Sequence, residues 1–98
     1  MKAVFDDRSP NWMPRLEDNV MFMRQQEMYL NDLLKKRGYV TIMDVFNYLG
    51  LPVELSRWWN KEFKDLCWVY NDGVKIKFGM RSNSDKNIIH LNFNINID

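Results

Sequence analysis

Residues 89–97 alternate between apolar and polar side chains without a break, and this alternation restricts the fold more than any other feature of the sequence. A period of two residues is typical of a β-strand with one buried and one solvated face. The polar positions are His90 and three asparagines, and the apolar positions are Ile89, Leu91, Phe93, Ile95 and Ile97. We therefore predict a C-terminal strand whose apolar face must be covered by other elements.

The segment 18–37 has helical periodicity and contains neither glycine nor proline. Its apolar residues recur every three or four positions, at Val20, Met23, Leu30, Leu33 and Leu34. Asp18 or Asn19 can cap the start, the basic residues 35–37 complement the negative end of the helix dipole, and Gly38 supplies a left-handed stop. This pattern predicts one long helix.

Two shorter helices are predicted to follow. Thr41 and Asp44 have the spacing of a capping box, and Gly50 can end the helix that they begin. Pro52 can then open a second short helix that continues to Trp59, because proline is tolerated in the first helical turn.

Beyond residue 64 the pattern becomes strand-like. Residues 67–70 are β-prone, residues 71–73 have turn chemistry, and residues 74–78 alternate, which together predict a β-hairpin. We expect an α+β fold, with one long helix and two short helices packed on a three-stranded antiparallel sheet. The expected organisation is a single domain, 1–98, with an extended N-terminal arm at 1–17, a helical part at 18–64, and the β-hairpin plus C-terminal strand at 65–98.

Composition narrows the class of protein. A chain of 98 residues that is 46% hydrophobic can fill one core, and its net charge of +1 favours no particular partner. The single cysteine, Cys67, lies in the apolar run 66–70, so we predict a buried thiol and exclude a disulfide scaffold. No stretch has the apolar length of a membrane span or a signal peptide, so we expect a cytoplasmic protein without a membrane partner.

Catalytic chemistry has little support in the sequence. The chain has one histidine and one cysteine, no clustered metal-ligand types and no glycine-rich phosphate loop. His90 falls among the asparagines of the last strand, so we interpret it as a solvated surface residue. We expect no enzymatic activity, no cofactor and no metal, and we assign no catalytic, cofactor-binding or metal-binding residue.

Segment 41–59 has a partial likeness to a DNA-reading helix-turn-helix. The small residue usual at the helix crossing is replaced by Phe46, and Arg57 is the only cation in the second helix. Nucleic acid is therefore a possible partner but not the favoured one.

Adjacent aromatic residues indicate where a protein partner could bind. Trp58 and Trp59 cannot both be buried easily by one short helix, and Arg57 beside them belongs to another residue type that is common at binding hot spots. We predict a contact surface at these three residues, with Tyr29 and Tyr39 as further candidates.

Several short motifs spread over the chain resemble one uncharacterised family. They are Asn19-x-Met21-Phe22, Leu34-Lys35-x-Arg37-Gly38, Leu49-Gly50-x-Pro52, Trp68-Val69-Tyr70, Phe78-Gly79 and Leu91-x-Phe93-Asn94. The chain is similar to the C-terminal domain of proteins from phages and prophages of Gram-positive bacteria, which implies a viral origin. Typical members also carry an N-terminal membrane segment, which is not among these residues.

These features favour a non-enzymatic, phage-encoded module that binds a host or phage protein. An inhibitor of a host defence protein, of the anti-CRISPR or another anti-defence type, is the function that we expect from size and origin. The alternatives are a DNA-binding regulator that uses segment 41–59, and a subunit of a phage assembly.

Overall fold

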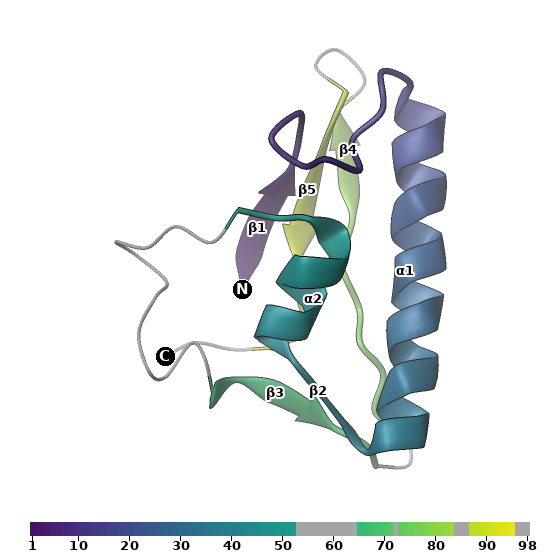
Figure 1. Cartoon of the computed structure of the whole chain (residues 1–98), viewed down its shortest axis with the longest axis vertical. Helices are drawn as coiled ribbons and strands as arrows, with labels where there is room; N and C mark the ends of the chain where they lie inside the picture. Colours follow the sequence, from purple (N-terminus) through teal and green to yellow (C-terminus); the bar gives the residue numbers. More distant parts are fainter. Residues whose placement is uncertain (53–64, 72, 84–86, 96–98) are drawn as a thin grey trace.

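A long helix, α1 (Leu16–Arg37), forms one side of the molecule in the computed structural model, which describes residues 1–52, 65–71, 73–83 and 87–95 (Figure 1). Its buried apolar residues are Met23, Leu30 and Leu34, as the helical spacing predicts. Gly38 ends the helix in the left-handed conformation, at φ 92°, and its N–H donates to the carbonyl of Leu34. The predicted helix and its stop are thus confirmed.

The predicted N-cap of this helix is wrong. The capping position is Arg15, which provides no side-chain hydrogen bond, so the helix begins before Asp18 and Asn19. Asn19 is fully buried instead. Its side chain accepts from the Met13 N–H and donates to the Met13 carbonyl, each over 2.8 Å. The amide that could have capped the helix therefore anchors the loop before it.

A short helix, α2 (Ile42–Leu49), follows the predicted capping box closely. The Thr41 hydroxyl accepts from the Asp44 N–H, and the Asp44 carboxylate accepts from the Thr41 N–H, each over 3.0 Å. Gly50 ends the helix with φ 69°. The capping box and the glycine stop are confirmed.

The C-terminal strand lies at the centre of a three-stranded antiparallel sheet. Its members are β1 (Lys2–Phe5), β4 (Arg81–Asn83) and β5 (Ile88–Asn92), in the order β1-β5-β4. Ile89, Leu91 and Phe93 are buried while His90 is exposed, so the predicted alternation is confirmed although the strand is shorter.

The N-terminal residues were expected to form an extended arm, but residues 2–5 are an edge strand of this sheet. Ala3 pairs with Leu91, and Phe5, which is fully buried, pairs with Ile89. By pairing with β5, the strand forms backbone hydrogen bonds. In an arm lying across the surface, the same N–H and C=O groups would bind water instead.

The predicted hairpin is also wrong. Strand β3 (Cys67–Val69) pairs with β2 (Tyr39–Thr41), the strand between the two helices, and the two form a separate antiparallel sheet. Only the middle residue of β3, Trp68, is buried, whereas Cys67 is exposed. The prediction of a buried thiol is therefore wrong, because the pleat turns Cys67 and Val69 to the same outer face.

Residues 73–80, the expected second arm of the hairpin, form no strand, yet Ile76 and Phe78 are fully buried. Polar side chains of α1 supply part of the backbone hydrogen bonding of this segment, and residues 92 and 94 supply another part, because their N–H groups donate to the carbonyls of Phe78 and Lys77. Asn31 binds both the N–H and the carbonyl of Ile76, over 2.7 and 3.0 Å. Glu27 accepts from the Phe78 N–H over 2.9 Å.

The observed architecture corrects the expected fold class. In the described residues, two helices pack on two small sheets, of three and two strands, rather than three helices on one three-stranded sheet. Figure 1 shows α1 beside the sheets and α2 in front of β5. The second short helix, expected between Pro52 and Trp59, lies outside the described residues after Pro52.

Candidate protein-binding surface

The predicted partner residues fall into two groups. Arg57, Trp58 and Trp59 lie outside the described residues, so their predicted role stays a prediction. Tyr29 and Tyr39 are described, and relative exposures of 44% and 47% place both on the surface. The structure connects these two tyrosines through side chains that the sequence did not single out.

Tyr48 is the first connecting residue. It lies on α2, and its ring contacts the Tyr29 ring of α1 edge to face, with centroids 5.1 Å apart and planes at 71°. A hydrogen bond with the Tyr29 side chain raises the pKa of Tyr48 above its ordinary value. Edge-to-face pairs of this kind contribute about 0.5–1.5 kcal/mol beyond their buried area, so the two rings hold each other in place at the surface.

Arg37 is the second connecting residue, in the last turn of α1. Its guanidinium carbon lies 4.4 Å from the centre of the Tyr39 ring, within cation–π range, and its Nε donates to the Tyr39 carbonyl over 3.0 Å. Its other end forms a salt bridge with Asp44 of α2. These contacts fix Arg37 between the two helices and β2.

Asp44 completes this link. Partial burial alone would raise the pKa of its carboxyl, but hydrogen bonds from the Thr41 N–H and Arg37 outweigh burial and lower the pKa below the ordinary value. The carboxylate is therefore charged at neutral pH, and one side chain both caps α2 and orients Arg37.

The outer face of the small sheet continues this surface. Tyr39 pairs with Val69 across β2 and β3, and Val69 is 62% exposed. We call Tyr29, Arg37, Tyr39, Tyr48 and Val69 the tyrosine surface. It combines three exposed aromatic rings, one oriented cation and one apolar residue, drawn from both helices and both strands of the small sheet.

The sequence suggested Tyr29 and Tyr39 as candidates, whose role stays a prediction, and it did not suggest Arg37 and Tyr48, which the structure places beside them. One signal was available for Tyr48. It lies four residues after Asp44, so both project from the polar side of α2, away from the buried positions 42, 45, 46 and 49. Arg37 lies in the last turn of α1, where the sequence predicted that residues 35–37 stabilise the negative end of the helix dipole. Its salt bridge with Asp44 could not be predicted, because it depends on how the two helices cross.

The described residues contain no group of three or more histidine, cysteine, aspartate or glutamate side chains that could hold a metal ion. Neither described helix is long and apolar enough to cross a membrane.

A family model of unknown function, DUF6353, matches residues 2–98. The chain belongs to this family. This membership confirms that the chain resembles an uncharacterised family. No curated protein and no solved structure matches the chain.

Proposed function

We propose that this DUF6353 chain is a non-enzymatic protein-binding module that contacts its partner through the tyrosine surface. The observation that carries the proposal is the position of the tyrosines. All four, Tyr29, Tyr39, Tyr48 and Tyr70, are exposed, whereas four of the phenylalanines, Phe5, Phe46, Phe78 and Phe93, are buried. Tyrosine and arginine are among the residues that most often dominate binding energy in interfaces.

The fixed geometry of this surface supports the same proposal. Ordering a flexible side chain on binding costs about 0.5–1.5 kcal/mol. Here Tyr48 is already held by Tyr29, and Arg37 by Asp44 and Tyr39. Binding a partner would therefore cost little additional side-chain entropy at these residues, because they are already ordered in the folded chain.

We further propose that the partner is a host protein and that the chain acts in the bacterial cytoplasm as a phage-encoded inhibitor of a defence system, for which an anti-CRISPR protein is the model. This step rests on the resemblance to phage proteins and on small size. If the captured partner were a phage structural protein, the assembly-subunit alternative would replace it. The DNA-reading alternative stays a prediction, because residues 53–59 lie outside the described residues.

Affinity capture from a nuclease-treated lysate of the host tests the surface. We expect the double variant Tyr39→Ala/Tyr48→Ala to lose the partner that the unchanged chain captures, because truncating two hot-spot rings typically costs about 2 kcal/mol or more each. The free energy of unfolding should fall by about 1–2 kcal/mol, because the variant also loses the Tyr29–Tyr48 and Arg37–Tyr39 contacts, and the chain should stay folded at the temperature of the capture.

The matched control is Met21→Ala/Met28→Ala, which truncates two exposed residues of α1, at 60% and 70% exposure, outside the tyrosine surface. This control should retain the partner. Equal capture by the two double variants, or equal loss, would show that the tyrosine surface is not the contact site.

A further inference from the structure

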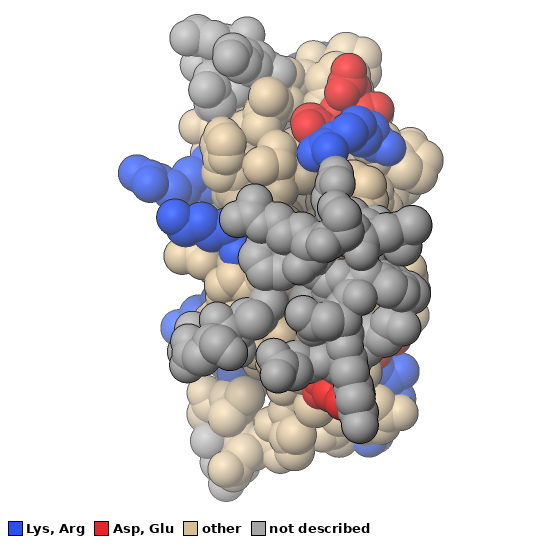
Figure 2. All heavy atoms as spheres, turned by 90° about the vertical axis from the view of Figure 1, so that its left-hand side faces the viewer, with Lys and Arg blue, Asp and Glu red and all other residues tan. Residues whose placement is uncertain are grey.

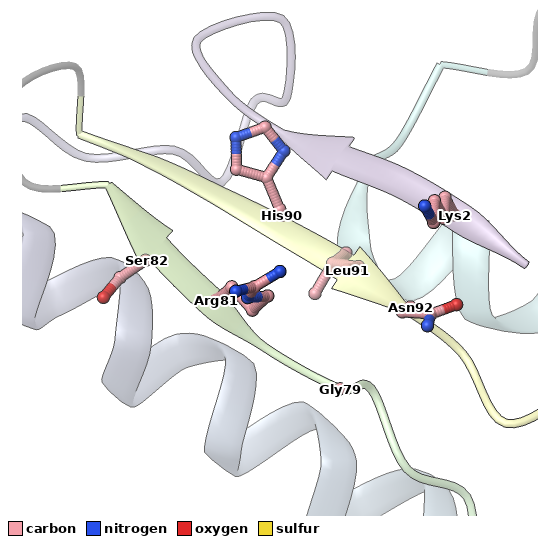
Figure 3. A pocket seen from close by; sticks show the side chains of 7 residues that line it. All are labelled: Lys2, Gly79, Arg81, Ser82, His90, Leu91 and Asn92. Carbon is pink, nitrogen blue, oxygen red and sulfur yellow. The ribbon is translucent and has the colours of Figure 1, made fainter.

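One face of the three-stranded sheet, on the side away from the helices, is not covered by them. Figure 3 looks onto this face, where a cavity of about 690 Å³ lies over the three strands. Its lining residues include Lys2 of β1, Arg81 of β4, and His90 and Asn92 of β5. The cavity size lies within the range of about 300–1,000 Å³ that is usual for small-molecule sites.

Two nitrogen-bearing side chains of this cavity, those of Arg81 and His90, lie opposite each other across the sheet, and Lys2 lies on the other outer strand. Arg81 is the register partner of His90, and Lys2 is the register partner of Asn92. Side chains directly opposite on one sheet face lie close together. Arg81 and Lys2 thus place two cations on one face of the sheet, where an anion bound over β5 would compensate their charge.

No carboxylate within the described residues supplies that compensation. Lys2, Arg81 and His90 form no ion pair there, and the residues that line the cavity include no aspartate or glutamate. Three other described cations form salt bridges, Arg8 with Asp6, Arg15 with Glu17 and Arg37 with Asp44. In Figure 2 a group of Lys and Arg side chains likewise projects at one edge of the molecule, apart from the Asp and Glu side chains.

The lining chemistry favours an oxyanion. Lysine and arginine side chains only donate hydrogen bonds, and histidine donates from both nitrogens when protonated. The Oδ1 atom of Asn92 already accepts from the N-terminal ammonium of Met1, over 3.3 Å, which leaves its Nδ2 as the donor for a ligand. An arginine fork matches two oxygens of one phosphate group.

We propose that this cavity binds a small phosphate-bearing molecule, with Arg81, Lys2 and His90 around the phosphate group. The site is independent of the tyrosine surface, since it lies on the face of the sheet that the helices do not cover. A phosphorylated ligand could thus be bound together with a protein partner.

The test is an amide NMR titration of the 98-residue chain with sodium pyrophosphate, with sodium chloride adjusted to keep the ionic strength constant. We expect saturable shifts at Lys2, Arg81 and His90. In Arg81→Gln the dissociation constant should rise about tenfold or more, because a charge-assisted fork is lost. Arg24→Gln, which removes an exposed cation from α1, is the matched control and should bind like the unchanged chain.

Shifts that do not saturate, or equal weakening in Arg81→Gln and Arg24→Gln, would overturn the proposal, because both indicate diffuse charge attraction. A twelve-base-pair DNA duplex is the second probe. If it bound the same residues roughly 100-fold more tightly than pyrophosphate, a nucleic-acid backbone would be the ligand and the small-molecule proposal would fail. Neither result would alter the capture of a protein by the tyrosine surface.

Discussion

Replacing Phe93 with alanine is expected to lower the free energy of unfolding by about 3–5 kcal/mol, the usual cost of emptying a buried phenylalanine site. Phe93 follows β5 and is 2% exposed. Its ring lies 5.5 Å from that of Phe78, 6.1 Å from that of Phe46 and 6.5 Å from that of Trp68, between centroids. These neighbours come from the 73–80 loop, α2 and β3, so the substitution opens a cavity where all three meet.

Chemical denaturation monitored by fluorescence measures this loss. The matched control is Phe22→Ala on α1, since Phe22 is only half-buried and its main ring contact is with Phe5, at 5.7 Å. It should lose about 1–2 kcal/mol, in proportion to the smaller area removed from the core. An equal or larger loss in Phe22→Ala would contradict the central position assigned to Phe93.

Gly79→Ala should be the most damaging single-methyl substitution among the described glycines, with a loss of about 3 kcal/mol or more. Gly79 has φ 59°, a conformation that costs alanine about 1–2 kcal/mol by itself. A Cβ atom there would also lie 2.4 Å from the backbone carbonyl oxygen of Asn92, so the loop before β4 and the end of β5 would have to separate.

Gly38→Ala separates the two causes. Gly38 also has positive φ, at 92°, but an added Cβ would meet no heavy atom within 4 Å. Only the conformational cost of about 1–2 kcal/mol should remain. Thermal and denaturant unfolding of both variants gives the comparison, and equal losses would show that the close approach of Gly79 to β5 does not matter.

The helices were predictable because their signals are local. The long helix needs only its apolar spacing and Gly38, and α2 needs only the capping box of Thr41 and Asp44 and the stop at Gly50. The alternation after residue 88 identified the buried side of β5 for the same reason, since the pleat alone decides which side chains share a face.

Strand pairing was not predictable, because it depends on contacts between distant segments. Turn residues at 71–73 favoured a local hairpin, but the chain instead pairs β3 with β2 and β1 with β5. Residues 74–78 alternate like a strand, yet their backbone groups bind the side chains of Asn31 and Glu27 of α1 and groups of residues 92 and 94 instead of a hairpin partner. Nothing in the local pattern distinguishes a polar helix residue that binds a loop from one that faces water.

The candidate surface was predictable only in its residue types. Exposed tyrosines could be proposed from composition and placement, which yielded Tyr29 and Tyr39. That Tyr48 joins them, and that Arg37 reaches Asp44 and Tyr39 together, depends on how α1, α2 and β2 pack. Cys67 was misplaced for a related reason, because its apolar neighbours resemble a core run, while the pleat buries only Trp68.

Site-specific photo-crosslinking in host cells tests most directly whether a protein partner binds at the tyrosine surface. A photoreactive phenylalanine analogue is placed at position 39 in one variant and at position 21, on the exposed outer face of α1, in another. We predict one discrete protein adduct from position 39 and none from position 21. Absence of an adduct at position 39, or the same adducts from both positions, would contradict the claim.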